Sequence, residues 1–333
     1  MTSHSVLTAR RHAGAALLAA MLTMTLVATF AAAALWQQFR GIEVEGAERI
    51  RVQSGWILTG ALDWARLILR QDAQSGETDH LAEPWATPMN EARLSSFLAA
   101  DNTISDTDNQ RDAFLSSQVS DLQARLNVTN LIDDSALSES GLQSFARLFD
   151  LLGLPAEQLS KLSGQMLKAS RAAAGPSDAA SSTQIPIIPQ RVEQLVWLGL
   201  SPDVLSVLSP YITLLPQRTP VNLNTASAEV IYAITPDLQL VDAQKLVAAR
   251  ARSHFRDLSE ASQQIGGAVQ FDDGRHSVAS RFFEVRERLK LDQVIVPERS
   301  LLQRDGLSIR TLWRDRGAVA DVVLPVSGNA PRS

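Results

Sequence analysis

The feature that most constrains this chain is a long uncharged segment close to its amino terminus. No Asp, Glu, Lys or Arg occurs from Ala13 to Phe39, and large apolar side chains are spread along that run. At about 1.5 Å of rise per residue, a helix of this length crosses the roughly 30 Å hydrocarbon layer of a bilayer. Arg10 and Arg11 precede the run, so by the positive-inside tendency the amino terminus stays cytoplasmic and the rest is exported.

The composition of the whole chain is that of a protein with folded domains. Of the 333 residues, 45% are hydrophobic and 20% are charged, which is enough apolar material for real cores. The net charge of −5 does not draw the protein toward nucleic acid or an anionic membrane surface. The absence of cysteine excludes disulfides, thiolate zinc sites and cysteine nucleophiles.

Two ways of processing fit the amino terminus. The small residues Ala31 to Ala34 would suit a signal peptidase, which would remove the apolar run from the mature protein. Gly14 instead separates the basic leader from the apolar run, and a cut after it would remove the leader alone. This second arrangement resembles the class III leader of type IV pilins and pseudopilins. The resemblance implies that prepilin peptidase cleaves between Gly14 and Ala15 and that Ala15 becomes N-methylated.

Two positions depart from the commonest pilin pattern. Most family members begin with Phe or Met where this chain has Ala15, and most carry Glu at the fifth mature position, where this chain has Ala19. That Glu is thought to neutralise the amine of a neighbouring subunit, because a lone charge inside a bilayer is costly. A subunit at the tip has no neighbour above it. K-type minor pseudopilins of type II secretion lack this Glu, and Ala19 agrees with them.

Beyond the membrane, the apolar spacing predicts that the helix continues. Apolar residues recur at intervals of three, four and seven from Ala47 to Ile68, which is one stripe of an amphipathic helix, and we expect it to end near Asp72. The polar segment from Gln74 to Arg111 is expected to form surface loops. Alternating apolar and polar side chains from Phe114 to Leu131 predict a half-buried strand.

A large helical region follows. From about Ile132 to Ala279 the spacing is helical, with frequent Gly and Pro, which predicts a separate α-domain placed between strands. Its linker, Ala172 to Gln184, is small, polar and expected to be flexible. Val192 to Leu214 and Val221 to Ile265 each resemble a helix-hairpin-helix unit, a fold that elsewhere binds DNA. The second hairpin, Thr235 to Leu240, has no glycine and adds a carboxylate, so it is not expected to bind phosphate through backbone amides.

Three segments near the carboxyl terminus predict strands. Side chains alternate with period two in Phe282 to Lys290, Leu291 to Arg304 and Gly306 to Arg314. Asp305-Gly306 predicts a tight turn between the last two. These strands should complete an antiparallel sheet on which the long helix lies.

Motifs along the chain resemble K-type minor pseudopilins of the type II secretion system. Besides Gly14 they are HLAEPWA (His80 to Ala86), the series Asp121, Arg125, Asn127 and Asn130, the series Asn222, Asn224, Thr225 and Ala226, and the final hairpin Pro297 to Arg314. The resemblance covers nearly the whole chain. It implies an α+β fold with a pilin-like long amino-terminal helix packed on an antiparallel sheet and a large inserted α-helical domain of SAM or helix-hairpin-helix type.

The predicted organisation follows from the pattern and the resemblance together. It comprises a leader peptide (1–14), a transmembrane helix (15–36), a helix continuation (37–73), a pilin-like α/β part (74–131), the inserted α-domain (132–279), carboxy-terminal strands of the sheet (280–316) and a flexible tail (317–333).

The resemblance implies a minor pseudopilin that initiates and caps the pseudopilus and so supports export of folded proteins across the outer membrane. It implies I-type and J-type minor pseudopilins, prepilin peptidase, the inner membrane and secreted substrate proteins as partners, without nucleic acid. The protein would be a single-pass protein of the bacterial inner membrane, with its bulk in the periplasm. Two other classes stay open at this point: a membrane-anchored periplasmic module that binds DNA or cell wall through its helix-hairpin-helix units, and an exported enzyme.

Candidate chemistry is sparse, so we expect a protein that is not an enzyme. The five histidines are scattered, no pair has the spacing of a zinc site on one helix, and there is no Gly-x-Ser-x-Gly elbow or phosphate loop. Asp133-Asp134 and Asp272-Asp273 offer carboxylate oxygens of the kind that Ca²⁺ prefers. K-type relatives carry acidic calcium loops in the α-domain, but the corresponding linker here holds only Asp178. No cofactor is expected, with calcium left as an alternative.

Overall fold

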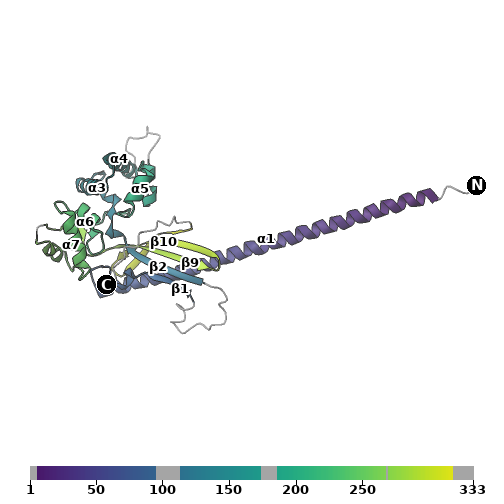
Figure 1. Cartoon of the computed structure of the whole chain (residues 1–333), viewed down its shortest axis with the longest axis horizontal. Coiled ribbons are helices and arrows are strands. Elements are labelled where there is room, and N and C mark those ends of the chain that lie inside the picture. Colours follow the sequence, from purple (N-terminus) through teal and green to yellow (C-terminus); the bar gives the residue numbers. More distant parts are fainter. Residues whose placement is uncertain (1–5, 95–112, 174–185, 268, 318–333) are drawn as a thin grey trace, which may run out of the picture. The chain divides into compact units, whose positions relative to one another are not determined.

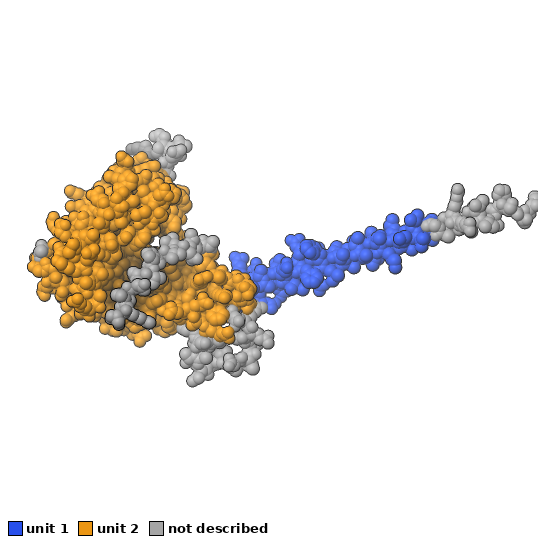
Figure 2. Space-filling view, in the orientation of Figure 1, with its two compact units in different colours: residues 1–59 blue, residues 60–333 orange. Residues whose placement is uncertain are grey.

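The computed structural model describes residues 6–94, 113–173, 186–267 and 269–317, with side chains from Ala15 onward. The chain forms two compact units, Met1–Thr59 and Gly60–Ser333 (Figure 2). The predicted linker lies outside the described residues except for Ala172 and Ala173, and so does the predicted tail after Gly317.

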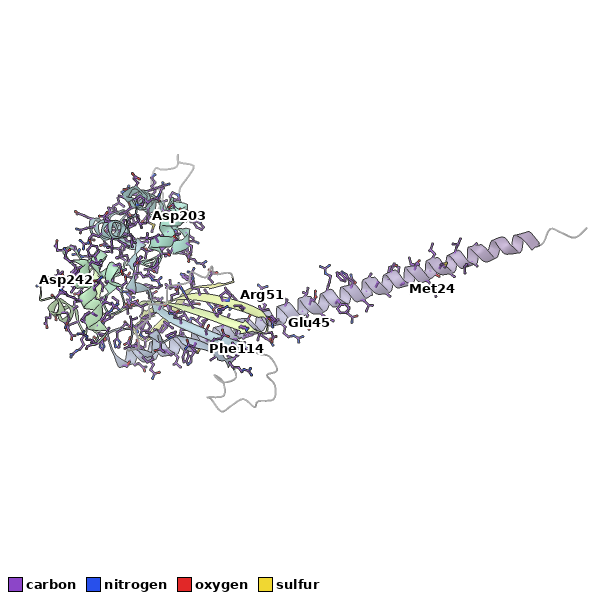
Figure 3. The ribbon with its side chains drawn as sticks, viewed as in Figure 1. Met24, Glu45, Arg51, Phe114, Asp203 and Asp242 are labelled. Carbon is purple, nitrogen blue, oxygen red and sulfur yellow. The ribbon has the colours of Figure 1, made fainter. Side chains whose placement is uncertain are left out.

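The first unit consists, in its described part, of the longer portion of helix α1 (Val6–Ser75). Its side chains from Ala15 to Glu45 are all exposed, including large apolar ones such as Phe30 (68%) and Trp36 (67%). Met24 projects from this helix in Figure 3. The stretch that begins at Ala15 is long and apolar enough to cross a membrane. Apolar side chains that no protein covers are suited to lipid.

Three threonines in this stretch have local hydrogen-bond partners. The hydroxyls of Thr23, Thr25 and Thr29 each donate to the backbone carbonyl three residues earlier, at 2.9, 2.9 and 2.8 Å. A hydroxyl that bonds within its own helix leaves no unsatisfied donor in a hydrocarbon environment.

The second unit is built on a five-stranded antiparallel sheet of order β1-β2-β9-β10-β11. The strands are β1 (Met89–Arg93), β2 (Ala113–Asp121), β9 (Phe282–Leu291), β10 (Val294–Asp305) and β11 (Ser308–Arg316). One face packs against the last turns of α1 through Leu62, Ala65 and Leu69, which contact a core containing Phe283 and Leu302 (Figure 1). The predicted fold class, a long helix on an antiparallel sheet with an inserted helical domain, is confirmed.

The inserted domain occupies the chain between β2 and β9. Its longer helices are α3 (Glu139–Leu151), α4 (Ala156–Ala173) and α7 (Leu240–Arg250). The shorter ones are α5 (Pro202–Leu208), α6 (Ala228–Ile234), α8 (Leu258–Gln264), and the 3-10 helices η2 (Leu122–Ala124), η3 (Val128–Leu131) and η4 (Val192–Leu198). Short strands complete it: β3 (Leu126–Asn127), β4 (Ile132–Asp133), β5 (Ala136–Leu137), β6 (Ile212–Thr213), β7 (Val221–Asn222) and β8 (His276–Ser277). One apolar core, which includes Phe145, Phe149 and Phe255, holds these elements together.

Two local predictions were wrong. The strand predicted from Phe114 to Leu131 ends at Asp121, and the chain continues through η2, β3 and η3. The cause is capping, because the Asp121 and Asn127 side chains accept hydrogen bonds from backbone amides two residues later and start 3-10 turns. The segment predicted as loops contains β1 and the 3-10 helix η1 (Pro84–Ala86), whose Trp85 is buried against Phe283 at a ring separation of 5.2 Å.

Candidate functional site: a buried polar joint between sheet and inserted domain

A cluster of buried polar side chains lies where the chain leaves the sheet for the inserted domain and where it returns. We call this cluster the joint. It consists of Asp79, Asp121, Asn222, Thr225, Ser280 and Arg304. These residues come from the loop after α1, the end of β2, the β7 region, the start of β9 and β10, so the joint ties sequence-distant segments together.

Asp121 is the centre of the joint. Its Oδ2 accepts hydrogen bonds from the hydroxyls of Ser280 (2.6 Å) and Thr225 (2.5 Å) and from the Asn222 amide (3.2 Å). Its Oδ1 accepts the backbone N–H of Gln123 at 2.7 Å. Burial raises the pKa of Asp121 to about 6, although the hydroxyl donors act in the opposite direction. A buried carboxylate of this kind fixes the geometry of every donor around it.

Arg304 supplies the positive charge of the joint. Its guanidinium donates to Asp79 at 2.5 Å, to Asp72 at 2.9 Å and to the Ser280 carbonyl at 2.8 Å. Burial raises the pKa values of both carboxyl groups, and the arginine partly offsets that effect. Oxygens of Asp72, Asp79 and Glu83 lie within 4.8 Å of one another, a separation that could suit a metal ion. The arginine already gives two of the three carboxylates a cationic partner.

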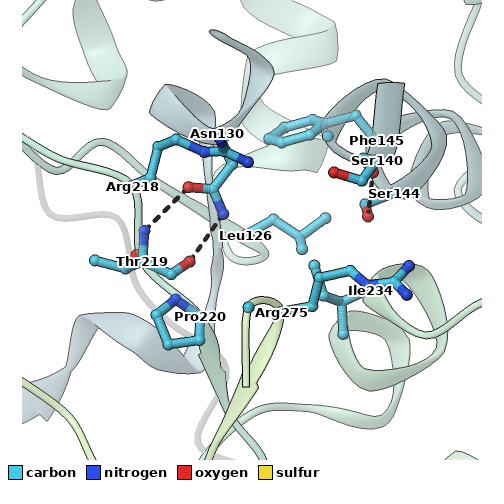
Figure 4. A pocket seen from close by; sticks show the side chains of 12 residues that line it. Leu126, Asn130, Ser140, Ser144, Phe145, Arg218, Thr219, Pro220, Ile234 and Arg275 are labelled. Carbon is cyan, nitrogen blue, oxygen red and sulfur yellow. Dashed lines mark hydrogen bonds between the residues drawn. The ribbon is translucent and has the colours of Figure 1, made fainter. Parts of the chain in front are cut away.

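A second set of side-chain hydrogen bonds holds the loop before β7. Asn130 forms a pair of bonds with the Thr219 backbone, accepting at 3.1 Å and donating at 2.8 Å (Figure 4). Asn127 donates to the Gln217 carbonyl at 2.8 Å and accepts the Leu215 amide at 3.1 Å. Both asparagines therefore act as structural clamps.

Beside Asn130 lies a cavity of about 310 Å³. Leu126, Phe145 and Ile234 line its apolar part, and Arg218 and Arg275 also line it (Figure 4). Each of these arginines is ion-paired, Arg218 with Asp133 and Arg275 with Asp272.

In each of the two acidic pairs predicted as calcium ligands, one aspartate has an arginine partner. Asp133 and Asp272 pair with arginines, while Asp134 has a positive φ of 43° in the turn between β4 and β5. Among the described residues, no group of three ligands includes Asp133, Asp134, Asp272 or Asp273. Calcium at these positions stays a prediction without a gathered ligand set to support it.

The hairpin between α6 and α7 is occupied by contacts within the domain. Arg147 of α3 donates to the carbonyls of Tyr232 and Leu238, both at 2.9 Å, and its guanidinium lies 4.1 Å from the Tyr232 ring centre. The Thr235 hydroxyl bonds to Nε2 of His276 at 2.9 Å. These contacts make the hairpin a packing element, and they give no support to the DNA-binding alternative.

The predicted processing residues lie in α1. Gly14 falls within the helix, and Ala15 is exposed at the start of the described side chains. Cleavage after Gly14 and methylation of Ala15 stay predictions.

Sequence reasoning singled out Asp121, Asn222 and Thr225 as motif residues but missed their partners. Asp79 and Ser280 are single polar residues in loops, and no pattern in the sequence sets them apart. Arg304 fits the alternating pattern of strand β10, so the sequence gives no sign that its guanidinium binds two buried carboxylates.

Comparisons with known proteins agree with one another. The family described as "Type II secretion system (T2SS), protein K" matches residues 221–279, and a first-domain family of the same description matches residues 124–217. A Type II secretion system protein K from Pseudomonas aeruginosa is 27% identical over 331 residues, covering 91% of this chain and 92% of the relative.

A solved structure shares the fold. It is the crystal structure of the GspK-GspI-GspJ complex from the enterotoxigenic Escherichia coli type 2 secretion system, in which one chain matches with a TM-score of 0.60 and 17% identity. The match covers 81% of this chain and 98% of that one. Both family matches fall in the inserted domain, and the Pseudomonas relative covers 91% of this chain, so the sequence and structure comparisons together support a K-type minor pseudopilin of type II secretion.

Proposed function

We propose that this protein initiates and caps the pseudopilus of a type II secretion system, and so supports export of folded proteins across the outer membrane. One observation carries the proposal: a single chain joins an uncovered apolar helix to a pilin-like sheet that holds the protein K domain between two of its strands. The helix serves as the membrane anchor and the sheet with its inserted domain as the exported body.

The proposed position at the tip has a physical basis in Ala19. A subunit that lacks a carboxylate there cannot neutralise the terminal amine of another subunit within the bilayer, and an unpaired charge in that layer is costly. The subunit is therefore suited to one end of the assembly and poorly suited to its middle.

The proposed partners are the I-type and J-type minor pseudopilins. The solved relative with the same fold was crystallised as a GspK-GspI-GspJ complex, which supports this choice. The contribution of the protein is binding, without a catalytic step of its own.

Processing and topology complete the proposal. Prepilin peptidase removes residues 1–14, Ala15 becomes the methylated terminus, and Arg10 and Arg11 keep the leader cytoplasmic while the body enters the periplasm. The protein is then a single-pass protein of the inner membrane.

The test combines mass spectrometry with a secretion assay in a strain that lacks the native gene. We expect a mature chain that begins at Ala15, with or without a methyl group, and restored export of a folded substrate. Co-purification with the I-type and J-type subunits is the second readout. A mature chain that begins near Leu35, or full export in the absence of the protein, would overturn the proposal.

A further inference from the structure

An open groove of about 810 Å³ lies on the face of the sheet that points away from α1. Strands β1, β2, β9 and β10 form one wall, and η4 with α5 forms the other. We call it the arginine groove, because its lining includes Arg125, Arg191, Arg286, Arg288 and Arg299. Its volume falls in the range of about 300–1,000 Å³ that is usual for ligand sites.

Arg125 is a residue of the groove whose charged side chain has no evident structural role within the described residues. It belongs to the sequence motif whose other members, Asp121, Asn127 and Asn130, all make structural hydrogen bonds. Its backbone N–H closes η2 on the Leu122 carbonyl, but its half-buried guanidinium has no ion pair or hydrogen bond among the described residues. Burial lowers the pKa of Arg125, in keeping with a cation that lacks a bonded counter-ion.

Two of the carboxylates that line the groove, Glu284 and Glu193, are already engaged by arginines, whereas the exposed Glu91 at its edge has no ion pair among the described residues. Glu284 pairs with Arg286 at 2.6 Å and lies 3.7 Å from Arg299. Glu193 accepts from Arg299 at 2.7 Å. Arg125 therefore has Glu284 and Asp121 as charged neighbours but forms no ion pair with either one, since Glu284 pairs with other arginines and Asp121 is bonded within the joint.

Two more glutamates in these strands, Glu287 and Glu298, do not offer their carboxylates to the arginines of the groove. Glu298 is 2% exposed and binds Arg314 and Arg316, while Glu287 is 3% exposed and has Asp63 of α1 among its charged neighbours. Successive side chains of a strand point to opposite faces, and both of these point toward α1. Arg125 and Arg288 remain without an ion pair among the described residues.

Apolar surface accompanies this positive charge. Ile295 is 47% exposed, and Leu205 and the Trp313 ring also line the groove. The Arg191 and Arg299 guanidinia lie 5.1 and 5.4 Å from the Trp313 ring centre. A ligand that fits must therefore combine carboxylates with apolar side chains.

From this arrangement we infer that the arginine groove binds an extended acidic segment of another protein, with Arg125 and Arg288 pairing with its carboxylates. Guanidinium groups bind carboxylates with two parallel hydrogen bonds, and alternating apolar side chains of the segment would contact Ile295 and Trp313. The tail of this chain after Gly317 is a poor match, because it contains one acid, Asp321, and one base, Arg332. The site is independent of the position proposed for the protein at the tip, so it can be tested on the purified full chain.

The first test measures peptide binding by fluorescence anisotropy, using the full-length protein in a non-ionic detergent. The probe is a labelled peptide of alternating Glu and Val. Matched peptides carry Gln or Lys in place of Glu. We expect the Glu peptide to bind saturably, at least about tenfold more tightly than the Gln peptide, and to weaken as salt is added. Equal binding of the Glu and Gln peptides would refute the inference.

The second test compares three variants with the same loss of charge. Arg125→Gln should weaken binding of the Glu peptide by at least about tenfold, and Arg288→Gln by about threefold because that side chain is exposed to solvent. Arg252→Gln, at an exposed position outside the groove lining, should leave binding unchanged. A loss as large in Arg252→Gln would mean general charge attraction and would overturn the assignment.

Thermal unfolding separates binding from a structural role. Arg125→Gln removes no partner within the described residues, so the melting temperature should not fall. A lower melting temperature with unchanged peptide binding would make Arg125 structural. If the peptide binds only after truncation behind Gly317 or deletion of residues 95–112, the chain covers its own groove and the inference fails.

Discussion

Asp121 illustrates how a single carboxylate can hold distant parts of a chain in register. It sits at the end of β2, and its donors come from the inserted domain and from the start of β9. A buried hydrogen-bond network is stabilising only while every member keeps a partner. The joint should therefore respond sharply to the loss of this one side chain.

Replacing Asp121 with Ala should lower the free energy of unfolding by about 3 kcal/mol, because the donors of Ser280, Thr225 and Asn222 lose an acceptor in the core. Urea unfolding measures the change. The matched control, Asp150→Ala, is exposed at the end of α3 and should stay within about 0.5 kcal/mol of the parent. A similar loss of unfolding free energy in both variants would show that Asp121 does not stabilise the joint.

His276 should make the inserted domain sensitive to acid. Burial lowers the pKa of His276 from its ordinary value of 6.5 to about 4, and Thr235, Asp272 and Arg275 are its polar neighbours. Between these two values the unfolded chain binds more protons than the folded chain, so stability is present above pH 6.5 and is lost as the pH falls toward 4. Melting temperatures of the parent and of His276→Gln across this range should converge at low pH. Melting temperatures of the two proteins that differ by the same amount at every pH would contradict a role of His276 in the acid sensitivity.

At the scale of elements, the pair β9 and β10 contains a feature with the opposite pH dependence. Glu287 and Glu298 are direct cross-strand neighbours beneath α1, and of these two only Glu298 forms ion pairs with arginines of the described residues. Within the part of the chain that the structure describes, neither carboxyl oxygen of Glu287 has a hydrogen-bond partner. Burial, with Glu298 as the next cause, raises the pKa of Glu287 to about 8.

For Glu287 the folded state holds its proton more tightly than the unfolded state, so stability is full at low pH and declines as pH rises from 4.5 to 8. Glu287→Gln keeps the shape without the charge. We expect a higher melting temperature than the parent at pH 8 and no difference at pH 4. A variant that is less stable than the parent at pH 8 would show that the ionised carboxylate has a favourable partner.

The elements also show which features the sequence could predict. The carboxy-terminal strands were predictable because period-two alternation is uninterrupted and Gly306 provides the positive φ of 57° that the turn requires. The predicted strand was longer than β2 because the alternation of apolar and polar residues continues past Asp121. The capping that ends β2 depends on side-chain hydrogen bonds, which the alternation does not reveal. The donors of Asp121 could not be predicted, since Ser280, Thr225 and Asn222 approach it only through the folded topology.

At the scale of the whole molecule, the exposed apolar part of α1 should decide where the protein resides. Replacing Leu26 with Asp places a charge in the middle of the uncharged run, at a cost of about 3 kcal/mol for insertion. We expect a clear loss of carbonate-resistant membrane association in cell fractions. Leu67→Asp is the control, since Leu67 is as exposed as Leu26 (55% against 52%) but lies in the second unit. Equal losses in both variants would contradict an anchor limited to the amino-terminal segment.

The insertion of a whole domain between two paired strands has a consequence for folding after export. Asp121 of β2 pairs with Phe283 of β9, so these two strands can pair only when segments separated in sequence by the entire inserted domain meet. The entropy cost of such closure falls when the intervening segment has already become compact. We therefore expect the inserted domain to fold first and the pairing of β2 with β9 to be the slow step, during which the open edges of both strands are exposed to aggregation.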